Sequence, residues 1–128
     1  MVEPAPLVLI VEDETANREL LAECVRLLGC RTSLAANGQE GLRLAQEQHP
    51  DLILLDMKMP VMNGAEMLRA LRASAATASI PVILVSSWLD SGQFDTANVG
   101  AMSYLDKPFT VRKLFEHIRH YLPNVQMP

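Results

Sequence analysis

The sequence predicts an α/β fold, a five-stranded parallel doubly wound sheet with five helices on its two faces. Apolar runs of strand length alternate with amphipathic segments of helix length along the 128 residues. Such alternation is typical of parallel strands joined by right-handed helical crossovers. The run 52–55 is apolar at every position, as expected for a strand buried on both faces. The length suits one domain, which we expect to span residues 1–128 with a core from about 7 to 122.

Three strands and two helices are expected in the first half of the chain. The apolar run 7–11 forms the first strand. Apolar residues then recur at spacings of three and four as far as Gly29, which indicates a helix that ends at a glycine. Residues 31–35 are a weaker strand candidate, and after a turn the segment 41–48 has the pattern of a short helix. The run 52–55 is the third strand.

The second half of the chain continues the alternation. A helix is expected after Gly64, since methionine and leucine recur there at helical spacing. Residues 81–85 and 102–105 form the fourth and fifth strands, and the last helix is expected at 111–122. The remaining helix must lie between the last two strands, where the stretch 90–98 is poor in helix-forming residues.

Composition and charge exclude several classes of protein. The formal net charge is −4 and the basic residues are scattered, which argues against binding to the phosphate backbone of nucleic acids. Cys24 and Cys30 match neither a disulfide framework nor a zinc pattern, so we expect two reduced core residues. The first residues do not form a signal peptide, and no apolar run approaches the length of a membrane span. We expect a cytoplasmic protein with neither membrane nor direct nucleic-acid contacts.

Polar residues follow four of the predicted strands. They are Glu12, Asp13, Asp56, Ser86 and Lys107. The carboxyl ends of parallel strands meet at one edge of the sheet, where the functional crevice of such folds lies. A single acidic residue after a strand is more often a helix N-cap than a ligand. Several carboxylates brought together resist ionisation unless a cation lies among them, and Mg²⁺ accepts carboxylates together with phosphate.

Such a set of residues suits phosphoryl transfer. A carboxylate can act as a nucleophile toward phosphorus, and Asp56 is the best candidate because it ends the most buried strand. The reaction depends mainly on alignment and on neutralising the phosphoryl oxygens. Mg²⁺ and Lys107 would neutralise them, and the Ser86 hydroxyl would donate a hydrogen bond.

Four motifs together resemble a two-component response-regulator receiver domain over about residues 7 to 122. They are Val11-Glu12-Asp13, the segment 51–60 followed by Asn63-Gly64, Val85-Ser86-Ser87, and Tyr104-Leu105-Asp106-Lys107-Pro108-Phe109. Each motif is weak alone, but all four in order at the family's spacing form a strong signal. The resemblance implies a flavodoxin-like sheet of order 2-1-3-4-5 and Mg²⁺ as cofactor. It also implies a phosphohistidine donor on a histidine kinase or histidine phosphotransfer domain.

The resemblance assigns the phosphoacceptor and the metal ligands. Asp56 matches the phosphoacceptor and is also a metal ligand. Glu12 and Asp13 match the acidic pair, with Asp13 the more direct ligand of the two. The backbone carbonyl of Lys58 matches a further metal ligand.

The resemblance also assigns a switch. Lys107 matches the lysine that contacts the phosphoryl group, and its bond to Pro108 matches the family's cis peptide. Ser86 matches the hydroxyl that moves toward the phosphate, which vacates space for an inward rotation of Tyr104. The surface near the fourth and fifth strands would then change its affinity for a partner. The alternative for Tyr104 is a half-buried ring fixed by packing.

Two features depart from the family's pattern. The chain is one residue shorter than expected between Ser86 and Lys107, so the surface around the fourth helix is expected to be short or irregular. Trp88 lies where the family varies, and we hypothesise that it shields the aspartyl phosphate from water. The alternative is that Trp88 packs on the surface or binds a partner. The residues expected to flank the site are Met57, Ser87, Trp88 and Pro108.

Other functions remain open from the residues alone. A flavin carrier can share this fold, but the acidic residues from Glu12 to Glu14 would repel its phosphate. Aspartyl phosphatases usually have a second acid where this chain has Lys58. A degenerate receiver would act only as a protein-docking module. A receiver could also stand alone or be cut from a hybrid histidine kinase. The segment 13–18 resembles receivers attached to such kinases, which favours the second possibility.

Overall fold

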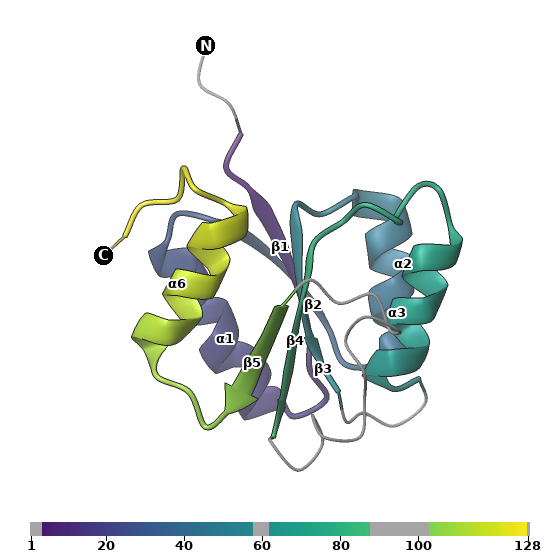
Figure 1. Cartoon of the computed structure of the whole chain (residues 1–128), viewed down its shortest axis with the longest axis horizontal. Coiled ribbons are helices and arrows are strands. Elements are labelled where there is room, and N and C mark those ends of the chain that lie inside the picture. Colours follow the sequence, from purple (N-terminus) through teal and green to yellow (C-terminus); the bar gives the residue numbers. More distant parts are fainter. Residues whose placement is uncertain (1–3, 58–61, 88–102, 128) are drawn as a thin grey trace.

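The computed structural model describes residues 4–57, 62–87 and 103–127. The strands are β1 (Leu7–Val11), β2 (Arg31–Ala35), β3 (Leu52–Asp56), β4 (Val82–Ser87) and β5 (Ser103–Lys107). The helices, labelled as in Figure 1, are α1 (Thr15–Leu27), α2 (Gly38–Gln48), α3 (Gly64–Ala73) and α6 (Val111–Tyr121). The strands form one parallel sheet of order β2-β1-β3-β4-β5, which confirms the predicted order.

Helices cover both faces of the sheet. Figure 1 shows α1 and α6 on one face and α2 and α3 on the other. Each pair encloses its own core cluster, to which the strands contribute alternate residues. The described residues contain four helices where the sequence predicts five, because the helix expected between the fourth and fifth strands falls within residues 88–102. That helix and the shortened segment around it lie outside the described residues.

The central strand is buried along its whole length. All five residues of β3 are buried, from Leu52 to Asp56. Its side chains point alternately into the two core clusters, so an unbroken apolar run is required there. The carboxylate of Asp56 therefore follows a strand that packing fixes on both faces.

Two predicted boundaries differ from the observed ones. α2 begins at Gly38 rather than at residue 41, because the Asn37 side chain accepts a hydrogen bond from the Glu40 backbone N–H at 2.8 Å. Asn37, which lies in the turn predicted before residue 41, is thus the helix N-cap. β4 and β5 also extend further than predicted, since their backbone pairing continues through Ser87 and Lys107.

α3 approaches the main chain of β3 closely. The Gly64 backbone N–H donates to the Met57 carbonyl oxygen at 3.1 Å. A Cβ atom added to Gly64 would lie 2.6 Å from the Asp56 carbonyl oxygen and 2.9 Å from the Met57 Cα. Because these are backbone atoms, they cannot move aside as a flexible side chain could. Only glycine allows this approach.

The two cysteines confirm their predicted role. Cys24 and Cys30 are both buried and unpaired. Both belong to the core cluster beneath α1 and α6. In the described ranges, no helix combines the length and apolar character needed to cross a membrane.

Candidate phosphoryl-transfer site

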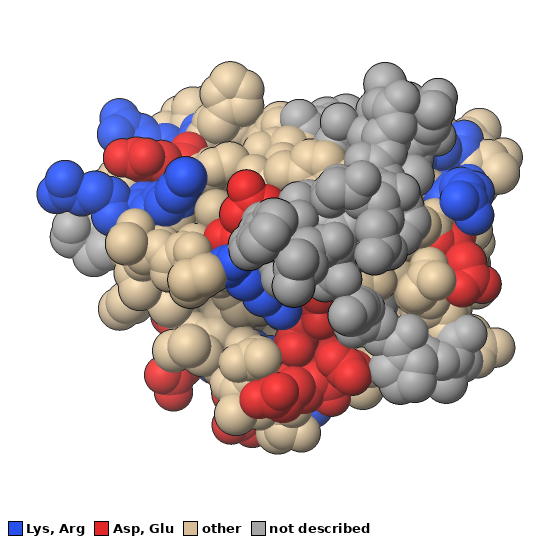
Figure 2. All heavy atoms as spheres, turned by 60° about the horizontal axis from the view of Figure 1, so that its bottom comes forward, with Lys and Arg blue, Asp and Glu red and all other residues tan. Residues whose placement is uncertain are grey.

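Three strands bring polar side chains to one edge of the sheet. Glu12 and Asp13 follow β1, Asp56 ends β3, and Lys107 ends β5. Figure 2 brings this end of the molecule forward and shows acidic side chains gathered beside basic ones. This edge is where open α/β sheets hold their functional crevice.

Glu12 is buried and held by several partners. Its backbone N–H donates to the Ala35 carbonyl oxygen at 3.0 Å, which extends the pairing with β2 beyond the end of β1. The Asn17 side-chain amide donates to Glu12 Oε1 at 3.5 Å. The Lys107 ammonium lies 3.9 Å from Glu12 Oε2, and only 3% of the Glu12 side chain is exposed.

The surroundings of Glu12 disfavour its charged form. Burial raises the pKa of Glu12 from 4.5 to about 7, and hydrogen bonding and repulsion from Asp56 act in the same direction. Lys107 and Asn17 lower this pKa but do not outweigh the burial. Such a carboxyl group exchanges its proton near neutral pH and would release it on binding a cation.

Asp56 forms an ion pair with the lysine from β5. The Lys107 ammonium lies 3.5 Å from Asp56 Oδ1, and 9% of the Asp56 side chain is exposed. The lysine side chain is 34% exposed, so it borders both the buried carboxylates and solvent. One ammonium group therefore contacts carboxylates from two different strand ends.

The three carboxylates fit a metal ion. Glu12, Asp13 and Asp56 each offer one oxygen, and these atoms all lie within 4.8 Å of one another. Hard oxygen ligands at one exposed and two buried positions suit Mg²⁺, which keeps some of its water ligands. Lys107 alone does not balance the negative charge of three ionised carboxylates. The donor set and its charge thus match the predicted cofactor.

The remaining predicted site residues are described in part. The backbone of Ser86 and Ser87 belongs to β4, where Val85 pairs with Asp56 and Ser87 with Lys107. Lys58 and Trp88 lie outside the described residues. The other predicted residues are a buried Met57, a half-buried Tyr104 packed on the core beneath α2 and α3, and an exposed Pro108 after a cis bond to Lys107.

Comparison with known proteins decides the family. Residues 8–119 match the response regulator receiver domain. The chain belongs to the response-regulator receiver family. The polar-differentiation response regulator DivK of Brucella ovis is 35% identical to this receiver over 116 residues, which cover 90% of this chain and 94% of DivK.

Solved receiver structures share the fold at 28–31% identity. The receiver domain of a Pseudomonas aeruginosa sensor histidine kinase has a TM-score of 0.86 and 29% identity, covering 94% of this chain and 99% of its own. That structure has a magnesium ion coordinated in the active-site cleft. A histidine-kinase receiver domain from Syntrophus aciditrophicus has a TM-score of 0.85 and 31% identity, covering 97% and 95%. The chemotaxis protein CheY4 of Vibrio cholerae has a TM-score of 0.82 and 28% identity, covering 91% and 98%.

Family membership defines the general activity. Receiver domains of two-component systems accept phosphoryl groups and interact with histidine kinases or phosphotransfer proteins. They are phosphoacceptors rather than conventional enzymes, and they bind Mg²⁺ in the active site. The flavin carrier and the aspartyl phosphatase are thereby set aside as alternatives.

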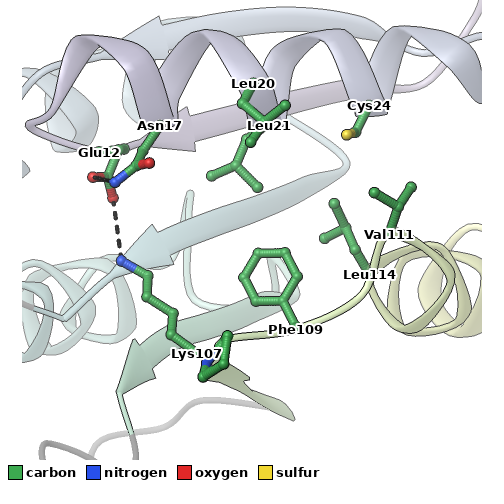
Figure 3. A pocket seen from close by; sticks show the side chains of 10 residues that line it. Glu12, Asn17, Leu20, Leu21, Cys24, Lys107, Phe109, Val111 and Leu114 are labelled. Atoms are coloured by element: carbon green, nitrogen blue, oxygen red, sulfur yellow. Dashed lines mark hydrogen bonds and ion pairs between the residues drawn. The ribbon is translucent and has the colours of Figure 1, made fainter.

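An apolar pocket adjoins the receiver's acidic cluster. Its volume is about 480 Å³. Figure 3 shows Glu12 and Lys107 at one end and Cys24, Val111 and Leu114 at the other. The pocket therefore lies between α1 on one side and, on the other, the segment that joins β5 to α6 together with the start of α6.

Sequence reasoning missed the two residues that hold the acidic loop. Asn17 donates to the Glu12 carboxylate, and Arg18 donates to the backbone carbonyls of Glu12 and Asp13. A signal was present in the sequence, because an arginine near the start of a helix opposes the helix dipole. Such a cation often has a specific local partner.

Proposed function

We propose that this receiver accepts a phosphoryl group on Asp56 from a phosphohistidine donor and then changes its partner-binding surface. The observation that carries the proposal is the Lys107 ammonium, which lies 3.5 Å from Asp56 and 3.9 Å from Glu12. A nucleophilic carboxylate, an adjacent cation and two further carboxylates are the groups that this transfer requires.

The transfer exchanges one bond to phosphorus for another. A carboxylate oxygen of Asp56 forms a bond to phosphorus as the bond from phosphorus to the donor's histidine nitrogen breaks. Lys107 neutralises charge on the phosphoryl oxygens from its place beside Asp56. Ser86, at the end of the neighbouring strand, is assigned a hydrogen bond to the bound group. Water later hydrolyses the acyl phosphate within the same site, so the domain catalyses only its own phosphorylation and dephosphorylation.

The acidic cluster is assigned to Mg²⁺. Glu12, Asp13 and Asp56 would hold the ion through their carboxylates, and the Lys58 backbone carbonyl would complete the protein ligands. When bound, Mg²⁺ supplies positive charge opposite the phosphoryl oxygens. Glu12 must lose its proton for this, and its raised pKa makes the loss depend on pH.

The first experiment tests Asp56. The protein is incubated with Mg²⁺ and acetyl phosphate, and the mass gain of one phosphoryl group is followed. Asp51→Asn is the matched control, because Asp51 stands at the other end of β3 and accepts from the Leu7 backbone N–H at 2.8 Å. Asp56→Asn should abolish the gain and Asp51→Asn should keep it. A folded wild-type protein that gains no mass with Mg²⁺ would support the docking-module alternative.

The proposed switch can be followed at Tyr104. The protein has two tyrosines, Tyr104 near the site and Tyr121 in α6, so fluorotyrosine labelling gives two ¹⁹F signals. Phosphorylation should shift the Tyr104 signal and leave the Tyr121 signal as an internal reference. An unshifted Tyr104 signal in the phosphorylated protein would favour a ring fixed by packing.

The donor and the phosphate lifetime complete the proposal. The donor is a histidine kinase or a histidine phosphotransfer domain, and the exchange is assigned to the cytoplasm, where both thiols stay reduced.

Trp88 is proposed to shield the acyl phosphate from water. Trp88→Ala should then shorten the dephosphorylation half-life, and an unchanged half-life would show that Trp88 has another role.

A further inference from the structure

The helix that follows the acidic pair lacks the capping contact of the other described helices. α2, α3 and α6 begin at Asn37, Asn63 and Thr110, whose side chains each accept a backbone N–H. The N-cap residue of α1 is Glu14, and it makes no side-chain cap hydrogen bond. The loop that carries two of the three clustered carboxylates is therefore fixed in some other way.

Arg18 supplies contacts to that loop. Its Nη1 donates to the Glu12 carbonyl oxygen at 2.8 Å and lies 3.4 Å from the Asp13 carbonyl oxygen. Its Nη2 is 3.4 Å from the Thr15 hydroxyl. One planar guanidinium group thus spans the acidic pair and the first residue of α1. The short bond to the buried Glu12 is the strongest of the three.

Charge alone does not explain an arginine at this place. A cation in the first turns of a helix opposes the helix dipole. It also stands beside a cluster that is expected to bind another cation, which it repels. The contribution of Arg18 must come from the directed hydrogen bonds to the loop.

We propose that Arg18 is a positioning residue for metal binding. Its guanidinium holds the two backbone carbonyls after β1 and so keeps the carboxylates of Glu12 and Asp13 within reach of one Mg²⁺ ion. The inference rests on the proposed function of the same site. It adds that the metal affinity depends on a residue that provides no ligand atom.

The direction of the change in Mg²⁺ affinity when Arg18 is replaced distinguishes this role from a purely electrostatic one. If Arg18 acted only through its charge, its neutral replacement would bind Mg²⁺ more tightly, because a repulsive cation is removed. If Arg18 positions the loop, the replacement binds Mg²⁺ more weakly. Loss of an outer partner of metal ligands typically lowers affinity about tenfold or more.

The experiment measures the Mg²⁺ dissociation constant by ¹H–¹⁵N NMR titration, which also reports whether each variant is folded. Arg18→Gln removes the charge and the guanidinium, and Arg18→Lys keeps the charge but loses the planar fork. Arg26→Gln is the matched control, since Arg26 is exposed in the last turn of the same helix.

Weaker binding specific to Arg18 supports the proposal. The dissociation constant should rise about tenfold in Arg18→Gln and by a smaller factor in Arg18→Lys. It should stay within about twofold of wild type in Arg26→Gln. An unchanged or lower dissociation constant in Arg18→Gln overturns the proposal. If Arg18→Gln does not fold, an Arg18→Lys variant that binds Mg²⁺ as tightly as wild type overturns it.

Labelling of Asp56 gives a second, independent readout. In Arg18→Gln the labelling rate with acetyl phosphate should fall at low Mg²⁺ and recover to the wild-type rate at saturating Mg²⁺. A loss that persists at saturation overturns a role through the metal. Absence of labelling in the wild-type protein would count against the proposed function, whereas the dissociation constants would still decide the role of Arg18.

Discussion

The two helical layers meet the functional edge in different ways. On one side, α3 packs against the main chain of Asp56 through Gly64, and Asn63 forms a capping box with Glu66. On the other side, Arg18 holds the loop after β1 by hydrogen bonds, and a pocket of about 480 Å³ separates α1 from the residues after β5.

The difference indicates that the site has one rigid side and one adjustable side. The backbone of Asp56 lies so close to Gly64 that a Cβ atom added to Gly64 would not fit. Glu12 and Lys107 border the pocket, and the lysine side chain is partly exposed. We therefore expect changes on the α3 side to cost stability and changes on the α1 side to alter protonation and metal binding.

The largest expected effect is a pH dependence confined to the α1 side. In metal-free protein the pKa of Glu12 is raised from 4.5 to about 7, mainly by burial. The folded state then binds more protons than the unfolded state between these values. The free energy of unfolding should fall by roughly 3 kcal/mol as the pH rises through this interval.

Urea unfolding in EDTA measures this effect, with Glu12→Gln as the control. The variant cannot titrate at this position and should lose less stability over the same interval. Equal slopes for the variant and the wild type would contradict the prediction. In the wild type, Mg²⁺ affinity should rise as Glu12 ionises.

Gly64→Ala should give the next largest effect. The new Cβ would lie 2.6 Å from the Asp56 carbonyl oxygen, so the start of α3 or the end of β3 must move. We expect a loss of about 2 kcal/mol in urea unfolding and slower labelling of Asp56. Alanine is otherwise the better helix former, so a variant as stable as wild type would refute the proposed crowding.

Removal of the N-cap side chain should give a smaller difference in stability between the two helical layers. The Asn63 side chain accepts the Glu66 backbone N–H at 2.9 Å, whereas Glu14 makes no cap bond. Asn63→Ala should cost about 1 kcal/mol, and Glu14→Ala should cost much less. Urea unfolding of the two variants measures the difference, and equal losses would contradict it.

The pocket itself should give the smallest effect. Cys24 lines the pocket, so Cys24→Leu can place its added atoms in open space and should cost less than about 1 kcal/mol. Cys30 is equally buried but does not line the pocket, and Cys30→Leu should cost more. If thermal unfolding shows the same loss for both, the pocket does not absorb the added volume.

The sheet was predictable because burial on both faces leaves a plain pattern. The runs before Glu12 and Asp56 are apolar throughout, and the α/β alternation predicted parallel strands. The strand order came from the resemblance to the receiver family. The ends of β4 and β5 were placed too early, since backbone pairing continues through Ser87 and Lys107 after the apolar residues stop. Hydrogen bonding of the main chain does not require apolar side chains.

The candidate site was predictable to the extent that it lies at strand ends. The edge rule brings Glu12, Asp56 and Lys107 together, and the structure places them within ion-pair distance. Asn17 and Arg18 could not be predicted in the same way. The helix dipole indicates that Arg18 needs a local partner, but the groups that Asn17 and Arg18 contact depend on the path of the preceding loop.

The burial of both cysteines on one side of the sheet allows the opening of that layer to be measured separately from the other. Cys24 and Cys30 lie in the core beneath α1 and α6, and burial raises the pKa of both thiols. A thiol-reactive reagent attacks the thiolate, so these residues react only when that layer opens. The rate of modification therefore reports opening of the layer formed by α1 and α6 and is insensitive to the layer that backs Asp56.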